Sequence, residues 1–176
     1  SGIAGANWTM GQLEKMVASM NHRGPDTHST FHSQDGITGL GHNRLSIIDL
    51  SAAGNQPMKS SDGRYVIVFN GEIYNYQELA KQLTRYPFKS NSDTEVVLAA
   101  YQQWGVQCLD RFIGMFALTI WDLQEKILFC ARDRFGVKPF YYHLNQDAFY
   151  FASEIKALHA DSIKKEINDQ VWSTYL

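Results

Sequence analysis

The sequence predicts an α+β fold in which two β-sheets pack face to face and helices cover their outer faces. Two observations predict it: apolar residues recur at helical spacing behind polar caps, and several short strand-like segments are apolar at consecutive positions. Strands of this kind need cover on both faces, whereas amphipathic helices need it on one. Two facing sheets with helices outside them satisfy both requirements.

Three helices are expected from capping boxes, in which a Ser, Thr or Asn precedes a Glu or Gln by three residues. The boxes are Thr9 with Gln12, Asn75 with Glu78, and Ser92 with Glu95. Gly105 should end the third helix. Strands are expected at residues 65–69, 115–121, 127–131, 140–142 and 149–152, with turns at 35–36, 62–63 and 145–147.

Length and charge limit the protein class. The 176 residues suit one domain, expected at residues 1–160, with the more polar residues 161–176 beginning a linker to a further domain. The net charge of -2 contains no long run of either sign, so no nucleic-acid or membrane partner is expected. Cys108 and Cys130 lie in apolar stretches, which favours reduced thiols and a cytoplasmic location.

Ser1 opens the chain and is the first candidate catalytic residue. A hydroxyl on a terminal residue lies beside its own α-amine, which has a pKa of about 7.7 to 8.0 and can act as a general base. Nucleophile and base would then belong to one residue. Mature or tag-cleaved chains also often begin with serine, so the assignment depends on a matching pocket elsewhere in the sequence.

Three further segments could build that pocket. Asn70 and Gly71 follow an apolar strand, and an Asn amide with a Gly N–H can stabilise an oxyanion, although Asn-Gly is also a common turn. Arg44 could hold a carboxylate, or form a surface ion pair. Asp93 could hold an ammonium group, or favour the dipole of the third helix. With Ser1, these groups would hold an amino acid by its head group and attack its side-chain amide, which describes glutamine.

Seven ordered blocks of the sequence resemble the glutaminase domain of glutamine-dependent asparagine synthetases. They are SGIAG at 1–5, HRGPD at 22–26, RLSIID at 44–49, NQPM at 55–58, FNGEIYN at 69–75, SDTE at 92–95 and RDRFGVKP at 132–139. That family belongs to the class II glutamine amidotransferases, which are N-terminal nucleophile hydrolases. The resemblance implies a four-layer αββα sandwich of two mainly antiparallel sheets with helices on the outer faces.

The resemblance also implies a role for each candidate residue. The catalytic positions are Ser1, Asn70 and Gly71, and the substrate-binding positions are Arg44, Leu45, Ile47, Asn70, Glu72 and Asp93. Asn70 and Gly71 would form the oxyanion hole. Arg44 would bind the glutamine carboxylate and Asp93 its amine.

Ser1 departs from the family pattern, in which the nucleophile is a terminal cysteine. A thiol ionises near pH 8.5 and is a strong nucleophile, whereas an alcohol depends wholly on base assistance. We therefore expect glutamine binding with greatly reduced hydrolysis, whether the serine is natural or an engineered replacement. The alternative is a non-catalytic structural or docking domain, as in β-lactam synthetase-type amide ligases.

No metal or cofactor is expected in this domain. His28 and His32 have i, i+4 spacing, but they lie in a strand-like segment with no third ligand nearby. The resemblance implies that ATP and magnesium bind only a C-terminal synthetase domain of the same parent chain. The expected partners are glutamine and that domain, with aspartate as the default acceptor of ammonia and a homodimeric parent left open.

Overall fold

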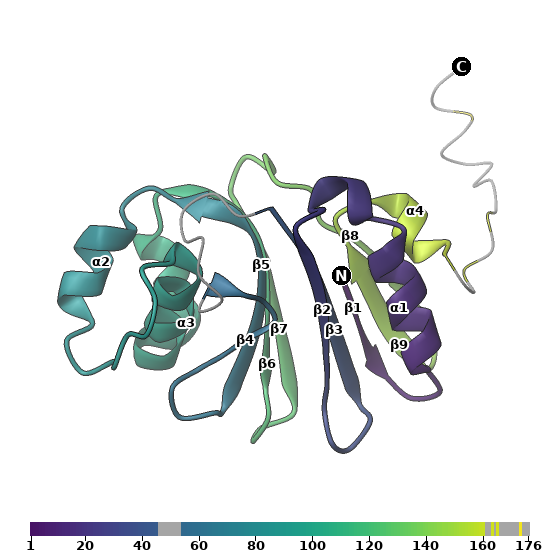
Figure 1. Ribbon diagram of the computed structural model, residues 1–176, viewed down its shortest axis with the longest axis horizontal. Coiled ribbons are helices and arrows are strands. Elements are labelled where there is room, and N and C mark those ends of the chain that lie inside the picture. Colours follow the sequence, from purple (N-terminus) through teal and green to yellow (C-terminus); the bar gives the residue numbers. More distant parts are fainter. Residues whose placement is uncertain (46–53, 161–162, 164, 166–172, 174–176) are drawn as a thin grey trace.

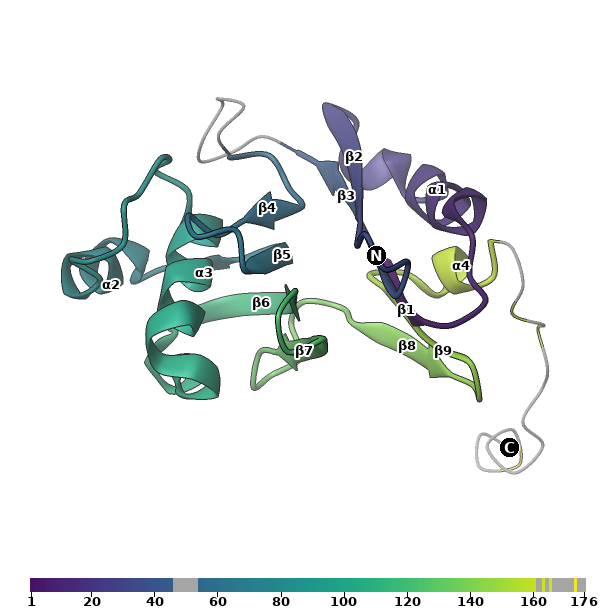
Figure 2. The ribbon, with the colours of Figure 1, turned by 90° about the horizontal axis from the view of Figure 1, so that it is seen from below.

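The structure is a computed structural model that describes residues 1–45, 54–160, 163, 165 and 173. Two antiparallel sheets face each other, and helices lie on the outer side of each sheet (Figure 1). Seen from below, the same layers follow one another across the molecule (Figure 2). The predicted α+β fold with two facing sheets is confirmed.

The first sheet has five strands in the order β2-β3-β1-β9-β8. Their bounds are β1 Gly2–Gly5, β2 Thr27–His32, β3 Thr38–Arg44, β8 Tyr141–Leu144 and β9 Ala148–Ala152. Helices α1 (Met10–Ala18) and α4 (Ile155–Leu158) cover its outer face (Figure 1). Because β1 pairs with β3 on one side and β9 on the other, the first residues of the chain lie at the centre of this sheet.

The second sheet has four strands in the order β4-β5-β6-β7. Their bounds are β4 Met58–Lys59, β5 Tyr65–Ile73, β6 Gly114–Asp122 and β7 Ile127–Arg132. Helix α3 (Asp93–Trp104) packs on β5, and α2 (Tyr76–Gln82) packs on α3. Two short 3-10 helices, η1 (Asn21–Arg23) and η3 (Gly105–Arg111), complete the described elements.

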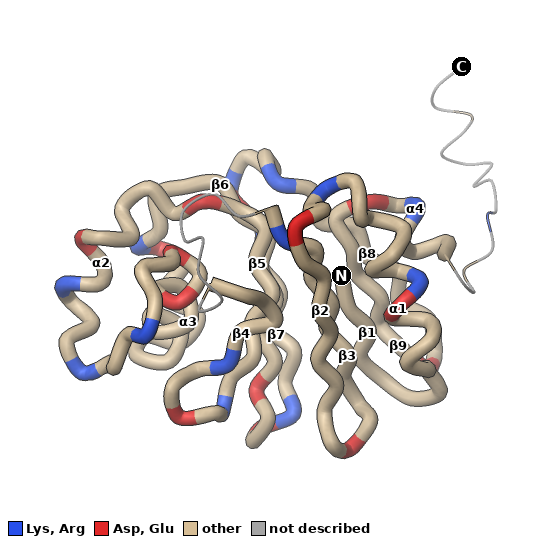
Figure 3. The backbone as a smooth tube through the Cα atoms, in the orientation of Figure 1, with Lys and Arg blue, Asp and Glu red and all other residues tan. Residues whose placement is uncertain are grey.

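Apolar side chains from both sheets fill the space between them. The buried members of this inter-sheet core are Leu40, Val66, Val68, Trp121 and Phe151. Acidic and basic residues are interspersed along the chain (Figure 3). Among the described residues, no helix is both long and apolar enough to cross a membrane.

The predicted capping boxes have different outcomes. Thr9 and Gln12 form the full reciprocal box of α1. Asn75 is the N-cap residue of α2, but its side chain makes no cap bond, because it accepts from the N–H of Ile113 and donates to the carbonyl of Arg111. The predicted helix is present, but the predicted box was wrong: the Asn75 amide instead joins the start of α2 to the segment before β6.

The box predicted at the third helix is half correct. Ser92 caps α3 by accepting from the N–H of Thr94, and Gly105 ends the helix with a φ of 57°. The Glu95 carboxylate does not return to the cap, because it accepts the backbone N–H groups of Lys89 and Ser90. It therefore holds the loop that leads into the helix.

The predicted strands correspond to β5 through β9, and the structure adds β1 to β4. The strand predicted at 65–69 continues to Ile73, so Asn70 and Gly71 lie inside β5 and not in a turn after it. The predicted linker at 161–176 lies almost entirely outside the described residues.

Candidate active site

A cavity of about 310 Å³ opens between the two sheets. We call it the larger cavity, to distinguish it from a smaller one beside Ser1. Its volume falls within the roughly 300 to 1,000 Å³ usual for small-molecule sites. It is lined by six of the predicted site residues, namely Arg44, Leu45, Asn70, Gly71, Glu72 and Asp93. Ile47 lies outside the described residues.

Ser1 lines a smaller cavity of about 40 Å³ beside the larger one. The two cavities share His42, Phe69 and Asn70 in their walls, so these residues separate them. The predicted nucleophile position and the predicted head-group residues therefore lie on either side of one boundary.

The α-amine of Ser1 is enclosed in the protein. It donates a hydrogen bond to the carbonyl oxygen of Gly41 at 2.9 Å. Burial without a charged partner lowers the pKa of this amine from 8.0 to about 5, since burial disfavours the charged form. At neutral pH the amine is therefore uncharged and can accept a proton, as a general base must.

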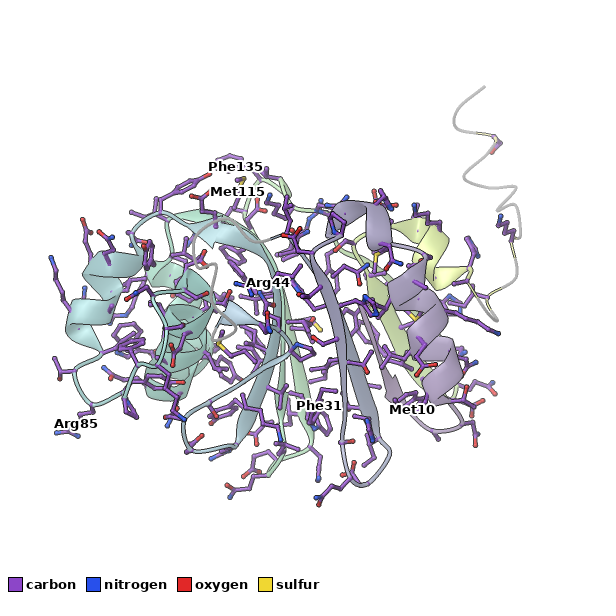
Figure 4. All side chains as sticks on the ribbon, viewed as in Figure 1. Met10, Phe31, Arg44, Arg85, Met115 and Phe135 are labelled. Carbon is purple, nitrogen blue, oxygen red and sulfur yellow. The ribbon has the colours of Figure 1, made fainter. Side chains whose placement is uncertain are left out.

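Strand β3 positions Arg44 at the larger cavity. Side chains alternate between the faces of a strand, so His42 and Arg44 share the face on which Leu40 packs into the inter-sheet core. Figure 4 shows Arg44 in the space between the two sheets. The residue is only 9% exposed, and its Nη1 donates to Oδ1 of Asn55 at 2.5 Å. This bond fixes one side of the guanidinium, a group suited to hold a carboxylate.

The pairing of β5 with β6 leaves the backbone N–H of Gly71 without a ladder partner. Gly71 lies opposite Phe116, whose own N–H and carbonyl both bond to Asp133 on the other side of β6. The two residues therefore form a non-hydrogen-bonded pair, and the Gly71 N–H faces away from β6. In the part of the chain that the structure describes, no group accepts from it.

The neighbouring N–H groups on that edge of β5 show what Gly71 could bind. The N–H of Phe69 donates to Oε1 of Gln56 at 2.6 Å, and the N–H of Ile73 donates to Oδ2 of Asp93 at 3.0 Å. Both flanking donors thus hold side-chain oxygens. The Gly71 N–H lies between them at the cavity wall, where it can donate to a ligand oxygen.

Glycine is required at position 71 for steric reasons. An added Cβ would lie 2.3 Å from the carbonyl oxygen of Met115 and 2.7 Å from the Cα of Phe116. The close approach of the two backbones therefore excludes a side chain here.

Asp93 lies at the start of α3 and is 4% exposed. Burial raises the pKa of its carboxyl, and the nearby Glu72 charge acts in the same direction, while backbone hydrogen bonds from Ile73 and Thr94 oppose the rise. A cationic ligand would relieve this cost by giving the carboxylate an opposite charge. Glu72 is exposed at the rim of the cavity.

Sequence reasoning missed His42, Asn55 and Gln56. Gln56 spans the site, since its Oε1 accepts from β5 while its Nε2 donates to Thr94 Oγ1 of α3 at 3.2 Å. His42 could have been found from its spacing, two residues before Arg44 on the same strand face.

The expectation that no metal binds here rests on His28 and His32. His28 and His32 lie in β2, where residues four positions apart are about 13 Å apart along the strand, too far to share an ion. Within the described residues, no group of three or more His, Cys, Asp or Glu side chains could hold a metal ion.

Comparison with known proteins decides the family. The family model described as a glutamine amidotransferase domain matches residues 1–176. The chain belongs to this family. The solved structure of glutamine phosphoribosylpyrophosphate amidotransferase from B. subtilis has a similar fold, with a TM-score of 0.76. That structure is 20% identical and matches over 90% of this chain and 42% of its own, so the likeness concerns the fold alone.

Curated relatives place this amidotransferase domain close to asparagine synthetases. It is 43% identical to "Asparagine synthetase [glutamine-hydrolyzing] 1" of Bacillus subtilis over 93% of this chain and 26% of the relative. It is 40% identical to "Putative asparagine synthetase [glutamine-hydrolyzing] 2" of Methanocaldococcus jannaschii over 89% of this chain and 33% of the relative. The domain thus spans about a quarter to a third of the length of these relatives.

Proposed function

We propose that this domain binds L-glutamine in the larger cavity and that Ser1 occupies the nucleophile position of a glutaminase. One observation carries the proposal: buried Arg44 and Asp93 share a cavity with the N–H of Gly71, which has no acceptor among the described residues. Opposite charges suit the carboxylate and ammonium of an α-amino acid, and the backbone donor suits the oxygen of its side-chain amide.

Hydrolysis would begin at Ser1. The neutral α-amine accepts the proton of the side chain at position 1, whose heteroatom attacks the carboxamide carbon. Asn70 and the N–H of Gly71 stabilise the oxyanion, and ammonia leaves to give a glutamyl-enzyme. Water then releases glutamate. Arg44 and Asp93 hold the head group throughout, so truncating either should mainly raise KM.

The hydroxyl of Ser1 limits the rate in this proposal. Glutamine should bind this chain and turn over slowly, because the oxygen depends on the amine for every proton it loses. A Ser1→Cys protein should release ammonia from glutamine well above the level of the present chain. Ammonia release that does not increase in a folded Ser1→Cys protein would contradict the proposal.

Calorimetry separates this function from a non-catalytic docking role. Heat of binding with glutamine, and none with glutaramate, which keeps the carboxylate and the amide but lacks the α-amine, supports a site that requires the head-group ammonium. Absence of a heat of binding at millimolar glutamine supports the docking role instead.

The parent protein's activity is a further part of the proposal. Since the relatives are glutamine-hydrolysing asparagine synthetases by name, we propose that ammonia passes to an ATP-dependent amide-forming domain of the same parent chain. ATP and magnesium would bind there, and aspartate is the default acceptor. Cys108 and Cys130 are free thiols, which suits a cytoplasmic location.

A further inference from the structure

Two buried polar atoms beside the smaller cavity have no hydrogen-bond partner among the described residues. They are Oγ of Ser1 and Nδ1 of His42, and both residues line that cavity. Buried polar atoms nearly always have partners, and leaving one without a partner is costly, so each such atom requires an explanation. The proposed mechanism already explains Ser1 Oγ as the nucleophile. It does not use His42.

The smaller cavity is suited to water. Its volume of about 40 Å³ cannot hold a glutamine side chain, but it exceeds the roughly 10 to 15 Å³ that one water needs. Besides Ser1 and His42, polar side chains of Asn70, Thr119 and Ser153 line it. A buried water needs two to four polar partners, and this wall supplies them.

The imidazole of His42 is suited to accept a hydrogen bond. Nδ1 of the ring is buried and has no hydrogen-bond partner among the described residues. We assign the ring proton to Nε2, so that Nδ1 keeps the lone pair with which it can accept a hydrogen bond from water. Burial, followed by the charges of the Ser1 amine and Arg44, lowers the pKa of His42 to about 4. The ring is therefore neutral during turnover.

We propose that Nδ1 of His42 positions the water that releases glutamate from the glutamyl-enzyme. His42 lies at the boundary between the two cavities. A water held there lies between the larger cavity, which would hold the γ-glutamyl group, and Ser1, to which that group would be bonded. The inference rests on the proposed function, because it concerns the second half of the same reaction. It makes His42 a positioning residue for deacylation.

The step balances as a hydrolysis. The water oxygen forms a bond to the γ-acyl carbon, and one water proton passes to the α-amine of Ser1. The bond between that carbon and the position-1 oxygen or sulfur breaks, and the amine returns the proton to this leaving atom. The products are glutamate and the free side chain. His42 contributes only the hydrogen bond that orients the attacking water.

The test compares water with a competing nucleophile in a Ser1→Cys background. Glutamine is supplied with hydroxylamine, and the ratio of γ-glutamyl hydroxamate to glutamate is measured. This ratio reports how the acyl-enzyme partitions, so it does not depend on how much of the protein is folded. Two variants form a matched pair: His42→Asn keeps a polar atom near the Nδ1 position, whereas His42→Gln keeps one near Nε2.

Loss of one positioning hydrogen bond should raise the hydroxamate-to-glutamate ratio about 3- to 10-fold in His42→Gln. In His42→Asn the ratio should stay within about twofold of the parent. An unchanged ratio in His42→Gln, or equal increases in both variants, would overturn the role of His42 and leave the glutaminase proposal standing. Absence of both products in the Ser1→Cys protein with His42 intact would overturn both proposals.

Discussion

The buried α-amine of Ser1 leads to a prediction about the acid side of the pH–rate profile. Its pKa is about 5, against 8.0 for an unburied amine. At pH 7 about 99% of the buried amine is the neutral base, compared with about 9% at a pKa of 8.0, so burial supplies about tenfold more base. In the Ser1→Cys protein, kcat/KM should therefore change little between pH 7 and 6 and fall below about pH 5.

The assay measures the rate of ammonia release by direct quantification in quenched samples between pH 4 and 8. Circular dichroism at each pH shows that the protein is folded. His42, with a pKa of about 4, titrates in the same acid limb. The His42→Asn variant removes this second group and leaves the amine alone. A half-maximal rate near pH 8 would refute the buried-base account, because it would assign the amine its unburied pKa.

Stability provides a second readout of the same pKa shift. Between pH 8 and 5 the unfolded chain binds a proton that the folded chain does not, so the free energy of unfolding should rise with pH across this window. Three pKa units correspond to about 4 kcal/mol. This value is an upper limit, because Ser1 as a whole is half-buried although its amine is enclosed. Urea unfolding of the present chain at pH 5 and 8 measures the difference.

Three substitutions give further expected outcomes. Arg44→Lys removes the planar fork and should weaken glutamine binding about 10- to 100-fold by calorimetry, while Arg64→Lys, which does not line the cavity and pairs with Asp122, should leave the affinity unchanged. Gly71→Ala should lower the free energy of unfolding by about 1–3 kcal/mol, because its methyl group meets the Met115 carbonyl; a urea midpoint equal to the parent's would contradict this. Asp133→Asn should cost about 2–3 kcal/mol in the same assay, since its carboxylate accepts four backbone N–H groups; a loss below about 0.5 kcal/mol would argue against it.

The second sheet could be predicted from the sequence far better than the first. Strands β5 and β6 carry consecutive apolar residues because both of their faces are buried. Strand β3 has no such pattern because Gly39 and Gly41 stand where side chains would be expected. A Cβ at Gly39 would lie 2.5 Å from the ring of Trp8, and one at Gly41 would lie 2.3 Å from Val17. Close packing on β3 of α1 and of Trp8, which precedes it, thus removes the periodicity that would identify the strand.

The candidate site shows a similar division. The sequence motifs predict four of the site residues correctly as neighbours, because the structure brings all four to one cavity: Arg44, Asn70, Gly71 and Asp93. The Gly71 N–H has no acceptor among the described residues. This could not be predicted from the motif, because it depends on the register of β5 against β6. The role of His42 likewise depends on which residues lie across the inter-sheet space.

The larger cavity draws its walls from both sheets, with Arg44 on β3 of the first and Gly71 on β5 of the second. A ligand that contacts both can bind only after the two halves of the sandwich have come together. Binding then raises the free energy of unfolding of the domain, by about 2.7 kcal/mol when free glutamine is a hundredfold above its Kd. In the proposed function, glutamine would in this way stabilise the fold as well as serve as the substrate.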